Sequence, residues 1–214
     1  MDMEDALGLE TSLTVFRTDA LYRFGSSRRH RFDLNYYDLR RSSTKVLARD
    51  IEFGDRIYPV GATVDSFFNI KLIKGGYSYS LIQDERIDFG LGVGLFVMPI
   101  EVGVSAAGVR ATEEKVTAPL PTISLHFDIA ITPKWFFRQS IDVFYLQVGA
   151  FQGGLYSGLF AVEYKPWKNF GFGAGYNFFQ LGIKADGKDY PNIQLTGKIE
   201  FAYTGLLLYG KVFF

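Results

Sequence analysis

The stretch RIDFGLGVGLFVM, residues 86–98, decides the fold class of this chain. Apolar side chains stand at every second position of it, namely Ile87, Phe89, Leu91, Val93, Leu95 and Val97. Aspartate and glycine fill most of the positions between them. A period of two residues is that of a β-strand with one apolar face. The same alternation returns at residues 123–132 and 194–204, so it is a property of much of the chain.

This alternation predicts a series of long strands. We expect nine of them, at residues 9–24, 30–42, 62–82, 86–103, 117–132, 136–150, 154–166, 170–185 and 190–214. A tilted strand needs roughly 9–11 residues to cross a bilayer, whereas strands of soluble domains average about 5–6. The predicted segments match the longer span. Adjoining apolar residues at Phe178 and Phe179, and a change of phase at Thr204 and Gly205, predict two β-bulges.

One segment admits a second interpretation. Residues 143–162 carry no charge, and a run of this length could be a membrane-spanning helix. The centre of the segment, however, reads Phe-Gln-Gly-Gly, which is a turn signal between two alternating runs. A β-hairpin is therefore the better prediction.

Composition excludes several classes of protein. The 214 residues suffice for one domain, which we take as residues 1–214. Lysine plus arginine and aspartate plus glutamate both total 23, and this neutral balance argues against binding to nucleic acid. There is no cysteine, so we expect neither disulfides nor thiolate metal sites. The 21 Phe and 13 Tyr, with only 7 Pro, suit strands whose faces meet an apolar medium.

The connections between the predicted strands fall into two classes. Four are short, at residues 25–29, 83–86, 132–134 and 166–169. Between them lie longer ones at 43–61 and 105–116, and links at 152–153 and 185–190. This asymmetry is typical of outer-membrane barrels, whose short turns are periplasmic. Aromatic residues flank two of the short turns, as expected at a membrane interface; they are Trp135, Phe136, Phe137, Tyr164, Trp167 and Phe170.

Charged residues fall opposite the apolar set on most strands. They are Arg17, Asp19, Arg23, Arg31, Asp33, Lys71, Asp88, Asp128, Arg138, Asp142, Glu163, Lys165, Lys198 and Glu200. In a soluble β-sandwich, which is the alternative fold, this face would be solvated. In a barrel it lines the lumen, where opposite charges pair or are hydrated. With apolar faces on nearly every strand, a small soluble domain would expose more apolar surface to water than such domains normally do. We therefore predict an all-β transmembrane antiparallel up-and-down β-barrel.

The last predicted strand carries an assembly signal. It ends GLLLYGKVFF, with Leu206, Leu208, Val212 and Phe214 on one face. A terminal aromatic residue on an alternating strand resembles the signal by which outer-membrane barrels are delivered to their assembly machinery. We therefore expect this machinery as a partner.

Strand parity raises a question about the start of the chain. Bacterial barrels have even strand numbers, so we hypothesise that a tenth strand precedes Met1. The acidic start MDMEDALGLE contains no signal peptide. The alternative is a strand hidden within residues 1–24 or 43–61, of which 43–61 is favoured because of its alternating KVLARDIEF.

The chain resembles a known group of proteins along nearly its whole length. The stretches that carry the resemblance are LTVFRTDALYRFGSSRRHRFDLNYYDLRR, DIEFGDRIYPVGATVDS, APLPTISLHFDIAIT, EYKPWKNFGFGAGYN and YTGLLLYGKVFF. They are similar to uncharacterised proteobacterial outer-membrane barrels of the broad OmpA/OmpW-like group. The resemblance implies the fold and the outer membrane as location, with a signal peptide and one more strand at the start. It implies no activity.

Candidate catalytic residues are few. Ser124, His126 and Asp128 share one face of a strand and could supply a nucleophile, a base and an orienting group. Residues two apart on a strand stand roughly 6.5–7 Å apart, so a relay would need help from neighbouring strands. We expect His126, and His30 after the first short turn, to be ordinary polar residues.

Glycine runs and acidic residues complete the list of candidates. Gly90, Gly92 and Gly94, and Gly171, Gly173 and Gly175, face inward on two strands. They either let a narrow barrel curve or make room for long charged side chains, or they widen a pore or a lipid-binding recess. Without a following helix they are not phosphate loops. Glu113 and Glu114 could bind a divalent ion, but solvated loop charges are commoner. We expect no metal site and no cofactor.

Three classes of function remain open. The first is a structural or passive barrel, with a narrow pore for small or hydrophobic solutes. The second is a membrane enzyme that modifies lipid A or lipopolysaccharide around His126. The third is a surface interaction protein that uses the 43–61 loop and its cations Arg40, Arg41, Lys45, Arg49 and Arg56. We favour the first class, as a monomer in outer-membrane lipid and lipopolysaccharide.

Overall fold

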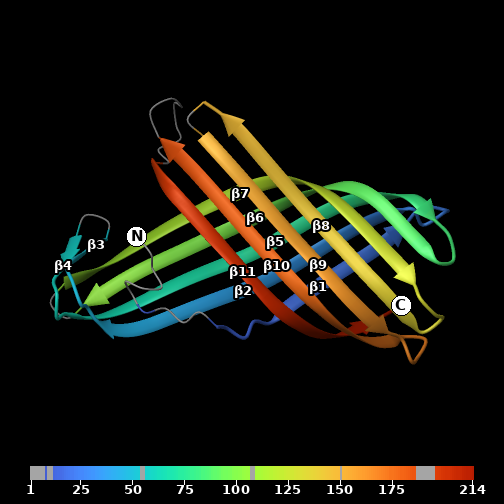
Figure 1. The fold of residues 1–214 in the computed structure, drawn as a ribbon, viewed down its shortest axis with the longest axis horizontal. Helices are drawn as coiled ribbons and strands as arrows, with labels where there is room; N and C mark the ends of the chain where they lie inside the picture. The colour runs from blue at the N-terminus through green and yellow to red at the C-terminus, as the bar shows by residue number, and fades with distance from the viewer. Residues whose placement is uncertain (1–7, 9–11, 54–55, 107–108, 150, 187–195) are drawn as a thin grey trace. The chain divides into compact units, whose positions relative to one another are not determined.

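Strands make up nearly all the regular structure of the chain (Figure 1). The structure is a computed structural model that describes residues 8, 12–53, 56–106, 109–149, 151–186 and 196–214. Its strands are β1 Arg17–Phe24, β2 His30–Val46, β3 Ile51–Phe53, β4 Arg56–Tyr58, β5 Thr63–Gln83, β6 Ile87–Ala106, β7 Val109–Ala130, β8 Trp135–Val148, β9 Phe151–Tyr164, β10 Phe170–Asp186 and β11 Thr196–Val212. None of these residues forms a helix long and apolar enough to cross a membrane.

The long strands pair in sequence order. One antiparallel sheet contains nine strands in the order β1-β2-β5-β6-β7-β8-β9-β10-β11. Each corresponds to one of the nine predicted segments, and the prediction of an all-β antiparallel fold is confirmed. The hairpin interpretation of 143–162 is also confirmed, because β8 pairs with β9 from Trp135↔Tyr164 to Val148↔Phe151.

The two long predicted loops contain more strand than expected. Most of residues 105–116 belongs to β6 and β7. Within 43–61, β2 continues to Val46, and β3 and β4 form a separate two-stranded sheet. This hairpin does not join the nine-stranded sheet, so it does not supply a tenth strand. A strand preceding Met1 stays a prediction.

The pairing of β10 runs without interruption on both sides. Its register with β11 is continuous from Phe170↔Val212 to Asp186↔Thr196, and its register with β9 is continuous from Phe172↔Tyr164 to Ala185↔Phe151. The two predicted β-bulges, at Phe178-Phe179 and Thr204-Gly205, are therefore wrong. In a regular strand two adjoining residues lie on opposite faces. Both faces of these strands carry apolar side chains, so adjacent apolar residues do not require a bulge.

The residues divide into two compact units. Unit 1 comprises Met1–Ala20, Leu34–Lys74 and Phe96–Pro119, and unit 2 comprises Leu21–Asp33, Gly75–Leu95 and Leu120–Phe214. Unit 1 has an apolar core around the β3–β4 hairpin, formed by Leu47, Ile51, Tyr58, Val64 and Val104. The Tyr58 hydroxyl donates a hydrogen bond of 2.9 Å to the Val104 carbonyl oxygen, which satisfies a polar group that is otherwise fully buried.

The short turns of unit 2 are joined to one another by backbone hydrogen bonds. The amide of Lys165 donates to the Lys134 carbonyl oxygen at 2.8 Å, and that of Ala130 donates to Arg86 at 2.7 Å. In the β5–β6 turn, the Asp84 carboxylate accepts hydrogen bonds from the amides of Arg86 and Ile87, both at 2.7 Å. These bonds favour the ionised carboxylate and hold the pKa of Asp84 below its ordinary value.

Candidate functional site

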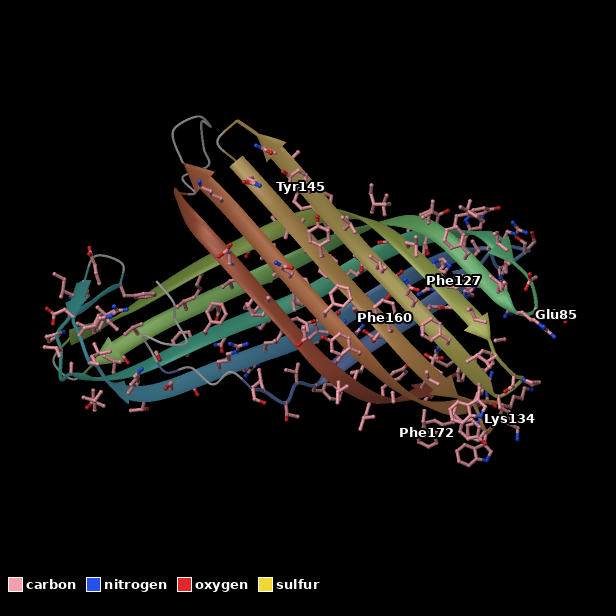
Figure 2. All side chains as sticks on the ribbon, in the orientation of Figure 1. Glu85, Phe127, Lys134, Tyr145, Phe160 and Phe172 are labelled. Atoms are coloured by element: carbon pink, nitrogen blue, oxygen red, sulfur yellow. The ribbon has the colours of Figure 1, made fainter. Side chains whose placement is uncertain are left out.

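Polar side chains are concentrated on the buried face of the sheet in unit 2. Buried polar or charged residues there are Arg31, Ser78, Ser80, Asp88, Thr122, Ser124, His126, Asp142, Ser157, Glu163 and Asn177. The alternate positions of the same strands carry exposed apolar residues, including Leu91, Val93 and Ile123. Phe160 and Phe172, labelled in Figure 2, are two more. Charged residues are seldom buried in a protein unless they are paired, so the partners of these groups define the candidate site.

Asp88 is the first centre of the buried charges. Its carboxylate forms an ion pair with Arg23 of β1, and one of its oxygens lies 3.3 Å from His126 Nε2 on β7. His126 is 3% exposed. Asp88, on β6, therefore contacts the neighbouring β7 and also β1, which is not next to β6 in the sheet order.

Asp128 is the second centre, and three arginines surround it. Its carboxylate oxygens lie 3.6 Å from Arg31 Nη1, 3.8 Å from Arg23 Nη2 and 3.8 Å from Arg138 Nε. These distances are too long for good hydrogen bonds but short enough for ion pairing. Since attraction between charges grows as the local dielectric falls, Asp128 holds together three cations that would otherwise repel one another.

Glu163 of β9 is the third centre. One of its oxygens accepts a hydrogen bond of 2.7 Å from the Tyr209 hydroxyl and lies 3.3 Å from Arg138 Nη1. Its other oxygen lies 2.9 Å from Lys211 Nζ. The glutamate is 7% exposed, so these contacts replace nearly all of the hydration that its carboxylate would have in water.

Together these groups form what we term the charged network. Its members are Arg23, Arg31, Asp88, His126, Asp128, Arg138, Glu163, Tyr209 and Lys211. Positive and negative groups alternate from Arg23 on β1 to Lys211 on β11, the two outer strands of the sheet order. The arrangement is suited to holding the buried face together. It offers no unpaired acid or base for proton transfer.

The three candidate catalytic residues do not form a relay. Ser124 donates its hydroxyl hydrogen to Asp142 at 2.6 Å, while His126 contacts Asp88 and Asp128 contacts the arginines. Each side chain points to a different partner. His30 Nδ1 lies 2.8 Å from the Tyr77 hydroxyl, beside the first short turn.

Two of the predicted inward charges lie on the other face. Lys71 is exposed, because the buried positions of β5 are the even ones, among them Ile70, Leu72 and Lys74. Glu200 is exposed as well, since the uninterrupted register of β11 places it on the same face as Leu206 and Leu208. The assignment of both residues to the inner face is corrected accordingly.

The remaining predicted charges occupy varied positions. Arg17 Nε and Asp19 pair with each other at 2.8 Å in unit 1. Lys165 lies in the turn after β9, over the ring of Phe213. Asp33 lies against Gly76, where a Cβ would come within 2.8 Å of its carboxylate. The side chains of Lys198, Glu113 and Glu114 lie outside the described residues.

Sequence reasoning missed three polar residues of this face. Lys211 and Tyr209 bind Glu163, and the Asn177 side-chain amide donates a hydrogen bond of 2.8 Å to the Gly158 carbonyl oxygen. A signal for the first two was present, because positions 209 and 211 alternate with the apolar stripe Leu206, Leu208 and Val212.

The inward glycines make room for members of the charged network. A Cβ on Gly90 would collide with the His126 ring, and one on Gly173 would collide with the Tyr209 ring. This supports the prediction that these glycines accommodate large side chains. Gly92 differs, because its neighbours are the Tyr77 carbonyl oxygen and the backbone and Cβ of Ser78.

Alanine at position 92 should destabilise the protein. Since the atoms in its way belong to the neighbouring strand's backbone, the strands must separate, at a cost of about 1–3 kcal/mol. The free energy of unfolding measured in denaturant checks this. Gly75→Ala is the matched control, because nothing lies within 4 Å of the Cβ that it adds; equal destabilisation by both variants would contradict the packing argument.

The residues of the unit 2 surface next to the C-terminus are strongly exposed. Leu206, Leu208, Val212 and Phe214 have exposed fractions of 90%, 82%, 63% and 110%.

Among the described residues, no group of three His, Asp or Glu side chains could hold a metal ion. No protein-family model, curated protein or solved structure matches this chain.

Proposed function

We propose that this chain is a transmembrane β-barrel protein of a Gram-negative outer membrane, with a structural or narrow-pore role. One observation carries the proposal: unit 2 exposes large apolar side chains on the face opposite a buried network of charges. The resemblance to OmpA/OmpW-like barrels is part of this proposal.

The exposed apolar side chains of unit 2 are contiguous. Ile123 of β7 pairs with Val143 of β8, which pairs with Tyr156 of β9, and all three are exposed. Further along the same pairing, Phe160 and Tyr176 stand opposite each other on β9 and β10. Soluble monomers rarely expose apolar patches beyond a few hundred Å². Hydrocarbon is the medium in which such a surface costs nothing.

The buried face favours a passive role over catalysis. Every carboxylate of the charged network has a cationic partner, and four Arg and Lys side chains face three carboxylates, so few of its charges are left open to a solute. Beyond it, most of the buried side chains of β9–β11 are apolar, among them Leu155, Phe179, Leu181 and Phe201, while Ser157 and Asn177 are polar. A solute passing both the charged network and the apolar side chains of β9–β11 would have to be small or hydrophobic. Ser124 and His126 have separate partners, so we do not propose a lipid-modifying enzyme.

Folding into lipid vesicles tests the proposal. The urea-unfolded chain, diluted into vesicles of a short-chain phosphatidylcholine, should gain a β-type circular dichroism spectrum and become resistant to protease. Dilution into buffer alone is the control and should yield aggregate. In planar bilayers we expect a conductance far below that of an open sixteen-stranded porin. A folded, monodisperse chain in detergent-free buffer would overturn the membrane assignment.

A further inference from the structure

The short-turn end of unit 2 carries an excess of positive charge. The cations within its four turns, at 25–29, 84–86, 131–134 and 165–169, are Arg28, Arg29, Arg86, Lys134, Lys165 and Lys168, whereas the carboxylates within them are Asp84 and Glu85. Asp84 is already engaged by two backbone amides. The excess is greatest around the β7–β8 and β9–β10 turns, which contain lysines and no carboxylate.

Aromatic rings lie directly beside these lysines. Trp135 packs on Tyr164 with ring centroids 4.7 Å apart, and Trp167 lies 6.2 Å from both Phe170 and Phe172. The two tryptophans are 45% and 61% exposed. Figure 2 shows Lys134 and Phe172 at the same end of the strands. Cations and exposed rings therefore form one surface, which we term the lysine–aromatic collar: Lys134, Trp135, Tyr164, Lys165, Trp167 and Lys168.

The collar is held in place by its backbone, and its charges are available. The hydrogen bond from the Lys165 amide to the Lys134 carbonyl oxygen ties the two turns together. Within the described residues Lys134 and Lys168 have no ion-pair partner, and Lys165 Nζ lies 4.0 Å above the ring of Phe213. Phosphate could therefore approach all three ammonium groups without breaking an existing ion pair.

We propose that the lysine–aromatic collar binds the phosphate groups of anionic phospholipids in the leaflet that surrounds the short turns. Amphipathic tryptophan and tyrosine rings lie at headgroup depth, and this places the lysines at the level of the phosphates. Basic residues near an anionic lipid surface each strengthen binding by about five-fold. The inference rests on the proposed function, since it requires the strands to cross a bilayer.

The tryptophans allow a direct test, because the chain has only two and both belong to the collar. The protein is folded into vesicles that mix ordinary phosphatidylcholine with brominated phosphatidylglycerol or brominated phosphatidylcholine. Bromine quenches tryptophan fluorescence on contact, so the quenching curves yield the relative binding of the two lipids at the collar. We expect a preference for the anionic lipid of at least about five-fold, the contribution of a single lysine, weakened in 0.5 M salt by screening (~4 Å Debye length).

The decisive variant is Lys134→Gln/Lys165→Gln/Lys168→Gln. In this variant the two lipids should bind at the collar about equally. The matched control is Arg40→Gln/Arg49→Gln/Lys115→Gln, which removes the same charge from exposed positions of unit 1 and should keep the preference. Equal quenching by both lipids in the parent protein, or equal loss in both variants, would overturn the collar while leaving the barrel intact. A chain that inserts into neither vesicle would overturn the proposed function and the collar with it.

Discussion

Glu163→Ala should lower the free energy of unfolding by about 3–5 kcal/mol. The substitution removes one carboxylate from a buried site and leaves Arg138 and Lys211, 3.3 Å and 2.9 Å from its oxygens, as uncompensated cations. It also leaves the Tyr209 hydroxyl without its acceptor. Urea titration of the protein folded in vesicles, followed by tryptophan fluorescence, measures the loss.

Two further variants distinguish the effect of breaking the charged network from the effect of removing a glutamate side chain anywhere in the protein. Glu85→Ala removes an exposed glutamate from a turn and should change the stability by no more than about 0.5 kcal/mol. Lys211→Met added to Glu163→Ala removes one of the stranded cations, so the double variant should recover part of the loss. If the two substitutions were strictly additive, Glu163 and Lys211 would not be coupled and the charged network would lose its energetic basis.

Ile123→Arg should destabilise the folded protein by about 2–4 kcal/mol, which is the cost of arginine on the lipid-facing side of a barrel near the midplane. Ile123 lies well inside β7, is 69% exposed and stands opposite Val143. If its surroundings are hydrocarbon, the guanidinium loses its hydration. If they are water, an arginine at so exposed a position costs within about 0.5 kcal/mol.

The same vesicle titration reads this difference. Glu85→Arg introduces the same group at an exposed position in the β5–β6 turn and serves as the control, with little expected change. Ile123→Leu, which keeps the apolar surface, should be neutral as well. A free energy of unfolding unchanged by Ile123→Arg would mean that this face meets water, and the membrane proposal would fall.

The nine strands could be predicted because their signal is local. In β6, the alternation of Leu91, Val93 and Leu95 with glycine reports directly which side chains share a face. The turns at Thr132 and Pro166 carry equally local signals in their residue types. The phase of β10 and β11 was harder, since Phe178 and Phe179 are adjacent and both apolar, and only the continuous pairing with β9 assigns them to opposite faces.

The residues of the candidate site could be predicted from the sequence, but the pairs that they form could not. That Asp88, Asp128 and Glu163 lie on the polar side of their strands follows from alternation. That Asp88 pairs with Arg23, which is 65 residues away, does not. For the same reason Ser124, His126 and Asp128 looked like one site in the sequence, although the structure gives each of them different partners.

The sequence by itself determined the all-β class, the number of long strands and the existence of an apolar and a charged face, because each depends on a period of two residues that any stretch of backbone displays alone. The tertiary structure decided the register of β10 and β11, the exposure of Lys71 and Glu200, and the partners within the charged network. Those properties depend on which strands lie beside or across from one another. No local pattern encodes the distance between side chains on different strands.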